Sequence, residues 1–97
     1  MPDGPVILIN AFEVPAGEDE AFLEIWERAR DFLRGQPGYL STRLHRSLAP
    51  TADFRFVNVA RWESAEAFQA ATSQPEFRNS SNPYRFHASL YEVVRED

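Results

Sequence analysis

The chain has 97 residues, of which 43% are hydrophobic and 13% aromatic, and this predicts one globular domain over residues 1–97. It has no cysteine, which excludes disulfides, thiolate nucleophiles and cysteine-ligated metal sites. Its formal net charge of -5 argues against a nucleic-acid partner, and no stretch is apolar for long enough to cross a bilayer. The N-terminal residues lack the basic region of a secretory signal, so we expect a cytoplasmic protein.

The first half of the chain predicts a strand followed by an amphipathic helix. Residues 6–14 are rich in branched aliphatic side chains, as a strand requires. Acidic residues 18–20 then favour the start of a helix, because negative charge stabilises the first turn. Gly35 and Pro37 end this helix. Its apolar side chains recur every three or four residues and predict one buried stripe: Phe22, Ile25, Trp26, Ala29, Phe32 and Leu33.

The middle of the chain predicts a β-hairpin over residues 38–48 and 54–62, joined by turn-forming residues. In the first of these strands, alternation places Leu40, Thr42 and Leu44 on one face. Ser41, Arg43 and His45 form the other face of that strand.

A second helix is predicted over residues 65–72, with Ser64 as its N-cap. Pro75 and the polar run 79–83 end or interrupt it. Residues 88–94 predict the last strand. The order β-α-β-β-α-β is typical of a ferredoxin-like α+β fold, in which a four-stranded antiparallel sheet carries both helices on one face.

Apolar side chains on both faces of the strands predict a homodimer. Ile7 and Ile9 lie opposite Leu8 on the first strand, and the third strand repeats this pattern with Val57 and Val59. Leaving such side chains in water forgoes roughly 1.5–3 kcal/mol each. We therefore expect two copies to pack their sheets face to face, as in a dimeric α/β barrel.

Three polar or aromatic residues predict a ligand pocket between the helices and the sheet. Asn10 and Asn58 interrupt the apolar faces of two adjacent central strands, and Trp62 shares the face of Asn58. Asparagine is a poor strand residue and is costly to bury without partners. Two amides could anchor oxygen atoms of a planar aromatic ligand, which the indole could stack on. The alternative is that the amides satisfy backbone groups and Trp62 belongs to the core.

The two histidines, His45 and His87, give a weaker signal. Either could act as a base or a haem ligand, but neither has clustered carboxylates beside it, and a structural role is the simpler interpretation. The sequence predicts no metal site.

Two segments and one turn resemble the antibiotic biosynthesis monooxygenase (ABM) domain family. The segments are Trp62-Glu63-Ser64-Ala65-Glu66-Ala67-Phe68 and Gln74-Pro75-Glu76-Phe77-Arg78, and the turn is Gly35-Gln36-Pro37-Gly38-Tyr39. The resemblance covers nearly the whole chain. It implies the same fold. The family includes cofactor-free oxygenases, haem-degrading enzymes and proteins of no known activity.

The resemblance to the cofactor-free oxygenases implies a monooxygenase that acts on a small aromatic substrate with O2 and needs no cofactor. Asn58 and Trp62 resemble the pair that such enzymes place in the substrate pocket, so they are the expected catalytic residues. A tyrosine of those enzymes is replaced by Phe68, and their arginine has no secure match here, although Arg78 and Arg85 lie nearby. The expected substrate-binding residues are Asn10, Phe12, Trp26, Phe56, Phe68 and His87.

Two other functions remain open. One is a non-catalytic dimeric module that binds a hydrophobic ligand. The other is haem binding or degradation, for which Asn10 resembles the family's first-strand asparagine. That branch's tryptophan and proximal histidine fall at about Ala71 and Ser81, so haem would need His45 or His87 in an unusual position.

Overall fold

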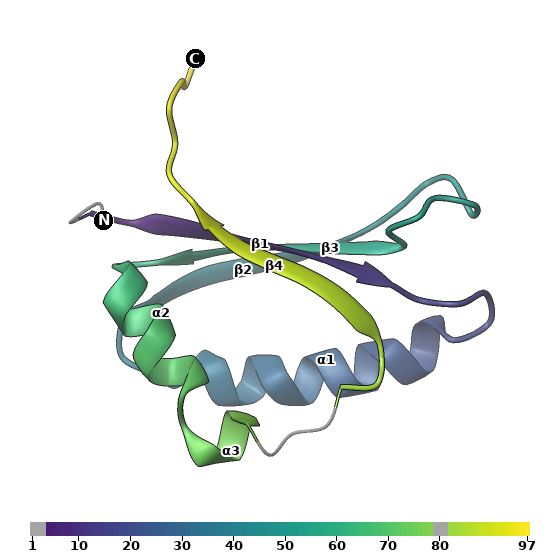
Figure 1. The fold of residues 1–97 in the computed structure, drawn as a ribbon, viewed down its shortest axis with the longest axis horizontal. Helices are drawn as coiled ribbons and strands as arrows, with labels where there is room; N and C mark the ends of the chain where they lie inside the picture. Colours follow the sequence, from purple (N-terminus) through teal and green to yellow (C-terminus); the bar gives the residue numbers. More distant parts are fainter. Residues whose placement is uncertain (1–3, 79–81) are drawn as a thin grey trace.

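The structure is a computed structural model that describes residues 4–78 and 82–97. Four strands form one antiparallel sheet in the order β2-β3-β1-β4 (Figure 1). The strands are β1 (Val6–Glu13), β2 (Tyr39–Arg46), β3 (Phe56–Trp62) and β4 (Arg85–Tyr91). The helices are α1 (Asp19–Leu33), α2 (Ala65–Thr72) and α3 (Pro75–Arg78). The predicted ferredoxin-like α+β fold is confirmed.

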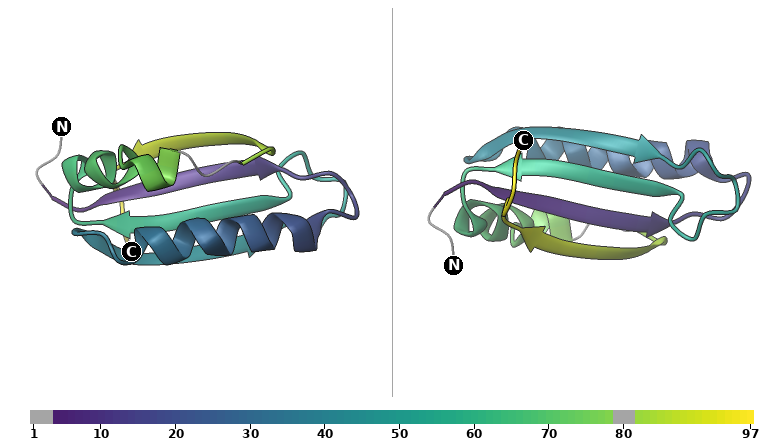
Figure 2. Two further views of the ribbon diagram at one scale, coloured as in Figure 1. Left: turned by 90° about the horizontal axis from the view of Figure 1, so that it is seen from below. Right: turned by 90° about the horizontal axis from the view of Figure 1, so that it is seen from above.

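The helices α1, α2 and α3 lie on one face of the sheet, and the other face, which we call the open face, carries no helix in the part of the chain that the structure describes (Figures 1 and 2). On β1 and β3 the open face is formed by partly buried apolar side chains, which include Ile7, Ile9, Val57 and Val59. The segment after β4 leaves the sheet on this side. Among residues 4–78 and 82–97, no helix is long and apolar enough to cross a membrane.

Two apolar clusters fill the space between the sheet and the helices. The first, which we call the Trp62 cluster, contains Val6, Leu8, Ala60, Trp62, Ala65 and Ala71. The second, the Phe22 cluster, contains Phe12, Phe22, Phe56 and Tyr84. They occupy opposite ends of β1 and β3, so the core is divided rather than continuous.

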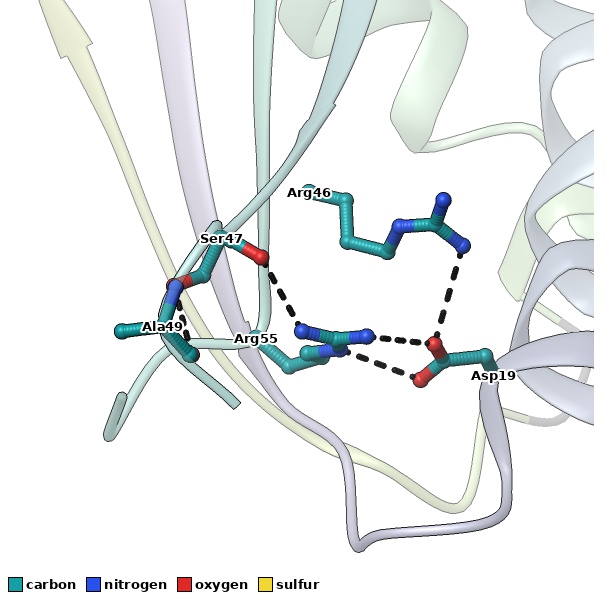
Figure 3. A network of polar contacts seen from close by, with 5 residues as sticks. All are labelled: Asp19, Arg46, Ser47, Ala49 and Arg55. Atoms are coloured by element: carbon teal, nitrogen blue, oxygen red, sulfur yellow. Dashed lines mark hydrogen bonds and ion pairs between the residues drawn. The ribbon is translucent and has the colours of Figure 1, made fainter. Parts of the chain in front are cut away.

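The start of α1 is held to the β2–β3 hairpin by an ionic network (Figure 3). Arg55 donates two hydrogen bonds to the Asp19 carboxylate, at 2.9 and 3.3 Å, and a third to the carbonyl of Ser47 at 3.0 Å. Arg46 lies 3.8 Å from the same carboxylate. The hydrogen bond from Arg55 lowers the pKa of Asp19, and the positive charges of Arg55 and Arg46 lower it further. This bidentate pair fixes the end of α1 that lies over the Phe22 cluster.

Gly38 allows β2 to begin against α2. It has a φ of 90°, a region that side-chain-bearing residues rarely adopt. A Cβ at this position would collide with the Cβ of Ala67 in α2. The Gly38 carbonyl accepts a hydrogen bond from the Glu63 amide at 2.8 Å, which joins this turn to the segment before α2.

α2 begins and ends where the sequence predicts. Ser64 accepts a hydrogen bond from the Ala67 amide at 3.1 Å, as an N-cap does. Pro75 does not only interrupt the helix but begins the short helix α3, where a proline's missing N–H has no cost. Part of the polar run that was expected to end the helix, residues 79–81, lies outside the described residues, as do residues 1–3.

Two details of the strands differ from the sequence-based expectation. β4 spans Arg85–Tyr91 instead of residues 88–94, because its pairing with β1 follows Glu13 back to Arg85. His87 therefore lies inside this strand and not before it. In β2 an irregularity between Tyr39 and Ser41 makes Tyr39 the partner of Trp62, so Leu40 does not continue the face of Thr42.

Candidate functional site

A cleft of about 840 Å³ lies between the sheet and the helices. All four strands contribute to its floor, and α1 and α3 contribute to its walls. Most of its lining is apolar or aromatic, as is usual for sites that take small organic molecules. The floor residues that matter most for its chemistry are Asn10, Thr42, Asn58, Ala60, Trp62 and Ala88.

Asn10 and Asn58 lie side by side at the centre of this floor. They are direct partners in the pairing of β1 with β3. Along β1, Asn10 lies between Leu8 of the Trp62 cluster and Phe12 of the Phe22 cluster. The same is true of Asn58 on β3, between Ala60 and Phe56. The amide pair therefore occupies the gap between the two halves of the core.

The two amides differ in how their oxygens are satisfied. Thr42 donates a hydrogen bond from Oγ1 to Oδ1 of Asn58 at 2.8 Å, and Asn58 is only 9% exposed. Oδ1 of Asn10 is buried and accepts no hydrogen bond from any described residue. A buried acceptor without a donor costs roughly 1–3 kcal/mol. A ligand hydroxyl or N–H placed in the cleft would remove that cost.

Trp62 closes one end of the floor. It is 1% exposed and makes edge-on contacts with Tyr39 and Phe68, at ring-centroid distances of 5.5 and 5.6 Å. Within residues 4–78 and 82–97 no hydrogen bond is formed by its indole N–H. Trp62 thus serves the core, and its N–H remains available as a donor.

The segment that leads into β4 closes the opposite end. Asn82 lines the cleft, and its Oδ1 accepts a hydrogen bond from the Tyr84 amide at 3.0 Å. The Tyr84 hydroxyl donates to Oε1 of Glu18 at 2.9 Å. Burial raises the pKa of Tyr84, and the neighbouring Glu18 carboxylate raises it further. This hydroxyl is therefore held as a neutral donor that ties the segment to the start of α1.

The cleft brings together six of the eight residues expected to form the site. These are Asn10, Phe12, Trp26, Asn58, Trp62 and Phe68. Phe56 does not line the cleft, because its ring is stacked on Phe22 within the core. Phe56 shares the face of Asn58, as the alternation predicts, but Phe22 of α1 covers its ring.

His87 lies on the open face, and its expected role in substrate binding is corrected. It pairs with Ala11 on β1, one residue away from the Asn10 face, so its ring points away from the cleft. Its Nε2 lies 2.8 Å from Oε2 of Glu13, and its ring is 5.2 Å from that of Phe54. His45, on β2, is exposed, with its Nδ1 3.1 Å from the Val57 carbonyl oxygen. The described residues contain no group of three or more side chains able to hold a metal ion.

Comparison with known proteins identifies the family of the chain. The family model described as antibiotic biosynthesis monooxygenase matches residues 5–82. The chain belongs to this family. The resemblance drawn from Trp62 to Phe68 and from the Gly35–Tyr39 turn is therefore confirmed.

Relatives in the family differ in what their names say they do. A heme oxygenase (mycobilin-producing) of Mycobacterium tuberculosis is 35% identical over 96 residues, which cover 93% of this chain and 90% of that protein. SnoaB, a cofactor-independent oxygenase from Streptomyces nogalater, matches with a TM-score of 0.83 and 26% identity over 96% of each chain. A protein from Shewanella loihica PV-4 matches with a TM-score of 0.89 and 42% identity, over 99% of this chain and 100% of that chain.

Tyr39 and Thr42 are among the residues that line the cleft of this ABM domain without having been assigned to it from the sequence. Tyr39 was missed because the irregularity after it leaves no signal in the alternation of side chains. Thr42 was placed on the correct face, but its bond to Asn58 depends on the register between β2 and β3. The alternation that places Thr42 on one face of its strand was the only hint available in the sequence.

Proposed function

We propose that the chain is a cofactor-independent monooxygenase that oxidises a small polyphenolic substrate with O2 in the cleft. The observation that carries this proposal is the unpartnered Oδ1 of Asn10 beside Asn58 and Trp62, in a cleft that is otherwise mainly apolar. The likeness to SnoaB, a cofactor-independent oxygenase, supports it, since that protein shares both the fold and nearly the full length of this chain.

In this proposal the amide pair binds the oxygen atoms of the substrate. A phenolic hydroxyl donates to Oδ1 of Asn10, and the side-chain N–H of Asn58 donates to a neighbouring substrate oxygen. Thr42 holds the other end of the Asn58 amide, so the donor is already oriented. Hydrogen bonds from Asn58 and from the Trp62 indole favour the deprotonated, electron-rich form of the substrate.

The substrate is its own reductant in this reaction. A ring C–H and a phenolic O–H are lost, and four electrons pass from the substrate to O2. One oxygen atom becomes the new quinone carbonyl, and the other leaves as water with the two hydrogens. The residues of the cleft supply binding, orientation and charge stabilisation, and the apolar walls exclude water from the reactive intermediate.

Oxygen uptake with a hydroxylated anthrone such as 1,8-dihydroxyanthrone tests the proposal. The rate above spontaneous oxidation should fall roughly tenfold to a hundredfold in Asn58→Ala, since a hydrogen bond to a charged group is worth about 1.5–3 kcal/mol. Trp62→Phe should also slow uptake. Gln69→Ala, on the exposed side of α2 and outside the cleft lining, also removes an amide; it is the matched control and should behave as wild type. If Asn58→Ala and Trp62→Phe both fold and turn over normally, the proposed site is wrong.

A non-catalytic binding module is the second candidate, and the same cleft supports it. It predicts saturable binding of a polyphenol, reduced by Asn58→Ala, with no oxygen uptake above the spontaneous rate. Measuring binding and uptake on the same samples separates the two functions.

Haem chemistry is suggested by one relative's name, but the residues here do not fit a haem held by histidine. The cleft lining contains no histidine, cysteine or methionine in the described part of the chain, and both histidines lie on other surfaces. Among residues 4–78 and 82–97, Tyr39 is the only lining residue of a type that ligates haem iron. Titration with hemin should therefore give no Soret band typical of histidine ligation.

In this proposal the chain forms a homodimer, and the two copies contact each other through the open face. Its central apolar side chains, Ile7, Ile9, Val57 and Val59, have no second layer among the described residues. A second copy packed sheet to sheet would bury them and leave the cleft, on the other side of the sheet, accessible.

A further inference from the structure

The charged residues that line the cleft have the opposite balance from the chain as a whole. The chain has 15 acidic and 10 basic residues, for a net charge of -5. The charged side chains that line the cleft are Arg28, Arg30, Glu76 and Arg78. Three positive charges thus accompany one negative charge at a cleft in an acidic protein. Such a local excess attracts anions even where the distant charges repel them.

Two of these arginines are available to a ligand. Arg30 is already engaged, because it pairs with Asp31 at 3.1 Å and its guanidinium lies 5.4 Å from the centre of the Trp26 ring. Arg28 and Arg78 are exposed and form no ion pair or side-chain hydrogen bond with any residue in the described ranges. Arg28 comes from α1 and Arg78 from the end of α3, so the charge reaches the cleft from two different elements.

We propose that the cleft has an anion subsite at Arg28 and Arg78, and that its ligands are aromatic carboxylates. The ring system lies on the floor against Asn10, Asn58 and Trp62, and the carboxylate remains near the solvent. A guanidinium suits this position, because its planar fork matches a carboxylate and its charge is held at every physiological pH. The inference names a substrate class for the proposed oxygenase and rests on that function, but the binding it predicts can be measured without turnover.

Two fluorescent probes with the same ring skeleton provide the test. 8-Anilinonaphthalene-1-sulfonate carries an anionic group, and N-phenyl-1-naphthylamine carries none. We expect Arg28→Gln and Arg78→Gln each to weaken binding of the anionic probe roughly two- to five-fold, and the double variant about tenfold. Binding of the neutral probe should not change. Arg95→Gln removes the same charge from the C-terminal segment, away from the cleft, and should leave both probes unaffected.

A variant that narrows the cleft shows where the probes bind. Ala88 lies on the floor and is exposed, so Ala88→Trp should reduce binding of both probes without disturbing the core. The anion subsite is refuted if the arginine variants weaken both probes equally, or if Arg95→Gln reproduces their effect. It is also refuted if the anionic probe still binds Ala88→Trp as it binds wild type.

Oxygen uptake separates this inference from the proposed function. If the probes behave as expected but no phenol is oxidised, the subsite stands and the oxygenase proposal fails. If a neutral anthrone is oxidised as well as its carboxylated analogue, and the arginine variants oxidise both normally, the oxygenase stands and the subsite fails.

Discussion

The buried amide of Asn10 costs the fold stability, and in the proposed function the same amide binds the ligand. Its buried Oδ1 has no donor among the described residues, whereas Oδ1 of Asn58 is bonded to Thr42. Removing an unsatisfied buried group is neutral or favourable, while removing one partner of a buried hydrogen bond is costly. The two amides are neighbours in the same pair of strands, so they can be compared directly.

We predict that Asn58→Leu lowers the free energy of unfolding and that Asn10→Leu does not. Asn10→Leu should raise it or leave it unchanged, whereas Asn58→Leu should lower it by roughly 1–3 kcal/mol because the Thr42 hydroxyl loses its acceptor. Urea unfolding followed by tryptophan fluorescence would measure both. Equal destabilisation by the two substitutions would show that Asn10 has a structural partner.

The central residues of the candidate site could be predicted from the sequence more readily than the residues around them. Asn10, Asn58 and Trp62 stand out because a polar or bulky side chain on the apolar face of an alternating strand usually has a specific structural or functional role. His87 was misplaced because the predicted strand began at residue 88, so its alternation did not reach His87, which in β4 shares the face of Tyr91 on the open side. Arg28 carries no signal in sequence, since exposed arginines on helices are common, and Arg78 was noted only as lying near the position of an arginine of the cofactor-free oxygenases.

At the scale of elements, the ion pair that Asp19 forms at the start of α1 makes the stability of the fold depend on pH. Its pKa is lowered in the folded chain by the hydrogen bond from Arg55. A depressed carboxyl pKa stabilises the fold above the ordinary value of 3.8, and this contribution is lost as the pH falls through the lower folded value.

We predict that Asp19→Asn lowers the free energy of unfolding at pH 6, and that its difference from wild type shrinks as the pH falls below about 4. Glu20→Gln is the control, because Glu20 lies in the same first turn but forms no ion pair within the described ranges. Urea unfolding at a series of pH values would measure the effect. A difference that stays constant from pH 6 to pH 2 would contradict it.

The contact between Gly38 and Ala67 fixes where β2 meets α2. Gly38→Ala should destabilise the chain by roughly 1–2 kcal/mol from backbone conformation alone, with a further loss from the clash with Ala67. The double variant with Ala67→Gly should lose less than the sum of the two single variants, since it removes the clash. Thermal unfolding of the four proteins would measure this coupling, and strict additivity would rule out the contact.

The element order, and the ends of α2, could be predicted because each depends on local patterns: alternation in strands, helical spacing and the Ser64 cap. The start of β4, the irregularity beside Tyr39 and the short helix α3 could not. Each of these depends on pairing or packing with residues far away in the sequence.

At the scale of the whole molecule, the open face predicts self-association. Light scattering should give a mass near twice the 11.1 kDa of one chain. Val59→Glu, at the centre of the open face, should shift the mass toward that of one chain, because a charge would be buried between the sheets. Glu27→Arg, on the exposed side of α1, should not change it. A wild-type mass near 11.1 kDa would refute the dimer.

The alternation of β1 and β3 has a consequence for how such a protein can change. Even-numbered residues of these strands face the cleft or the core, and their odd-numbered neighbours face the open side. Substitutions at Asn10 or Ala60 can therefore alter which molecule is held while Ile9 and Val59 keep the same surroundings. Ligand preference and assembly can then diverge separately under selection, and a library randomised only at even positions would explore new ligands at unchanged quaternary structure. Deletion of a single residue within either strand would exchange the two sets of side chains and disrupt both properties together.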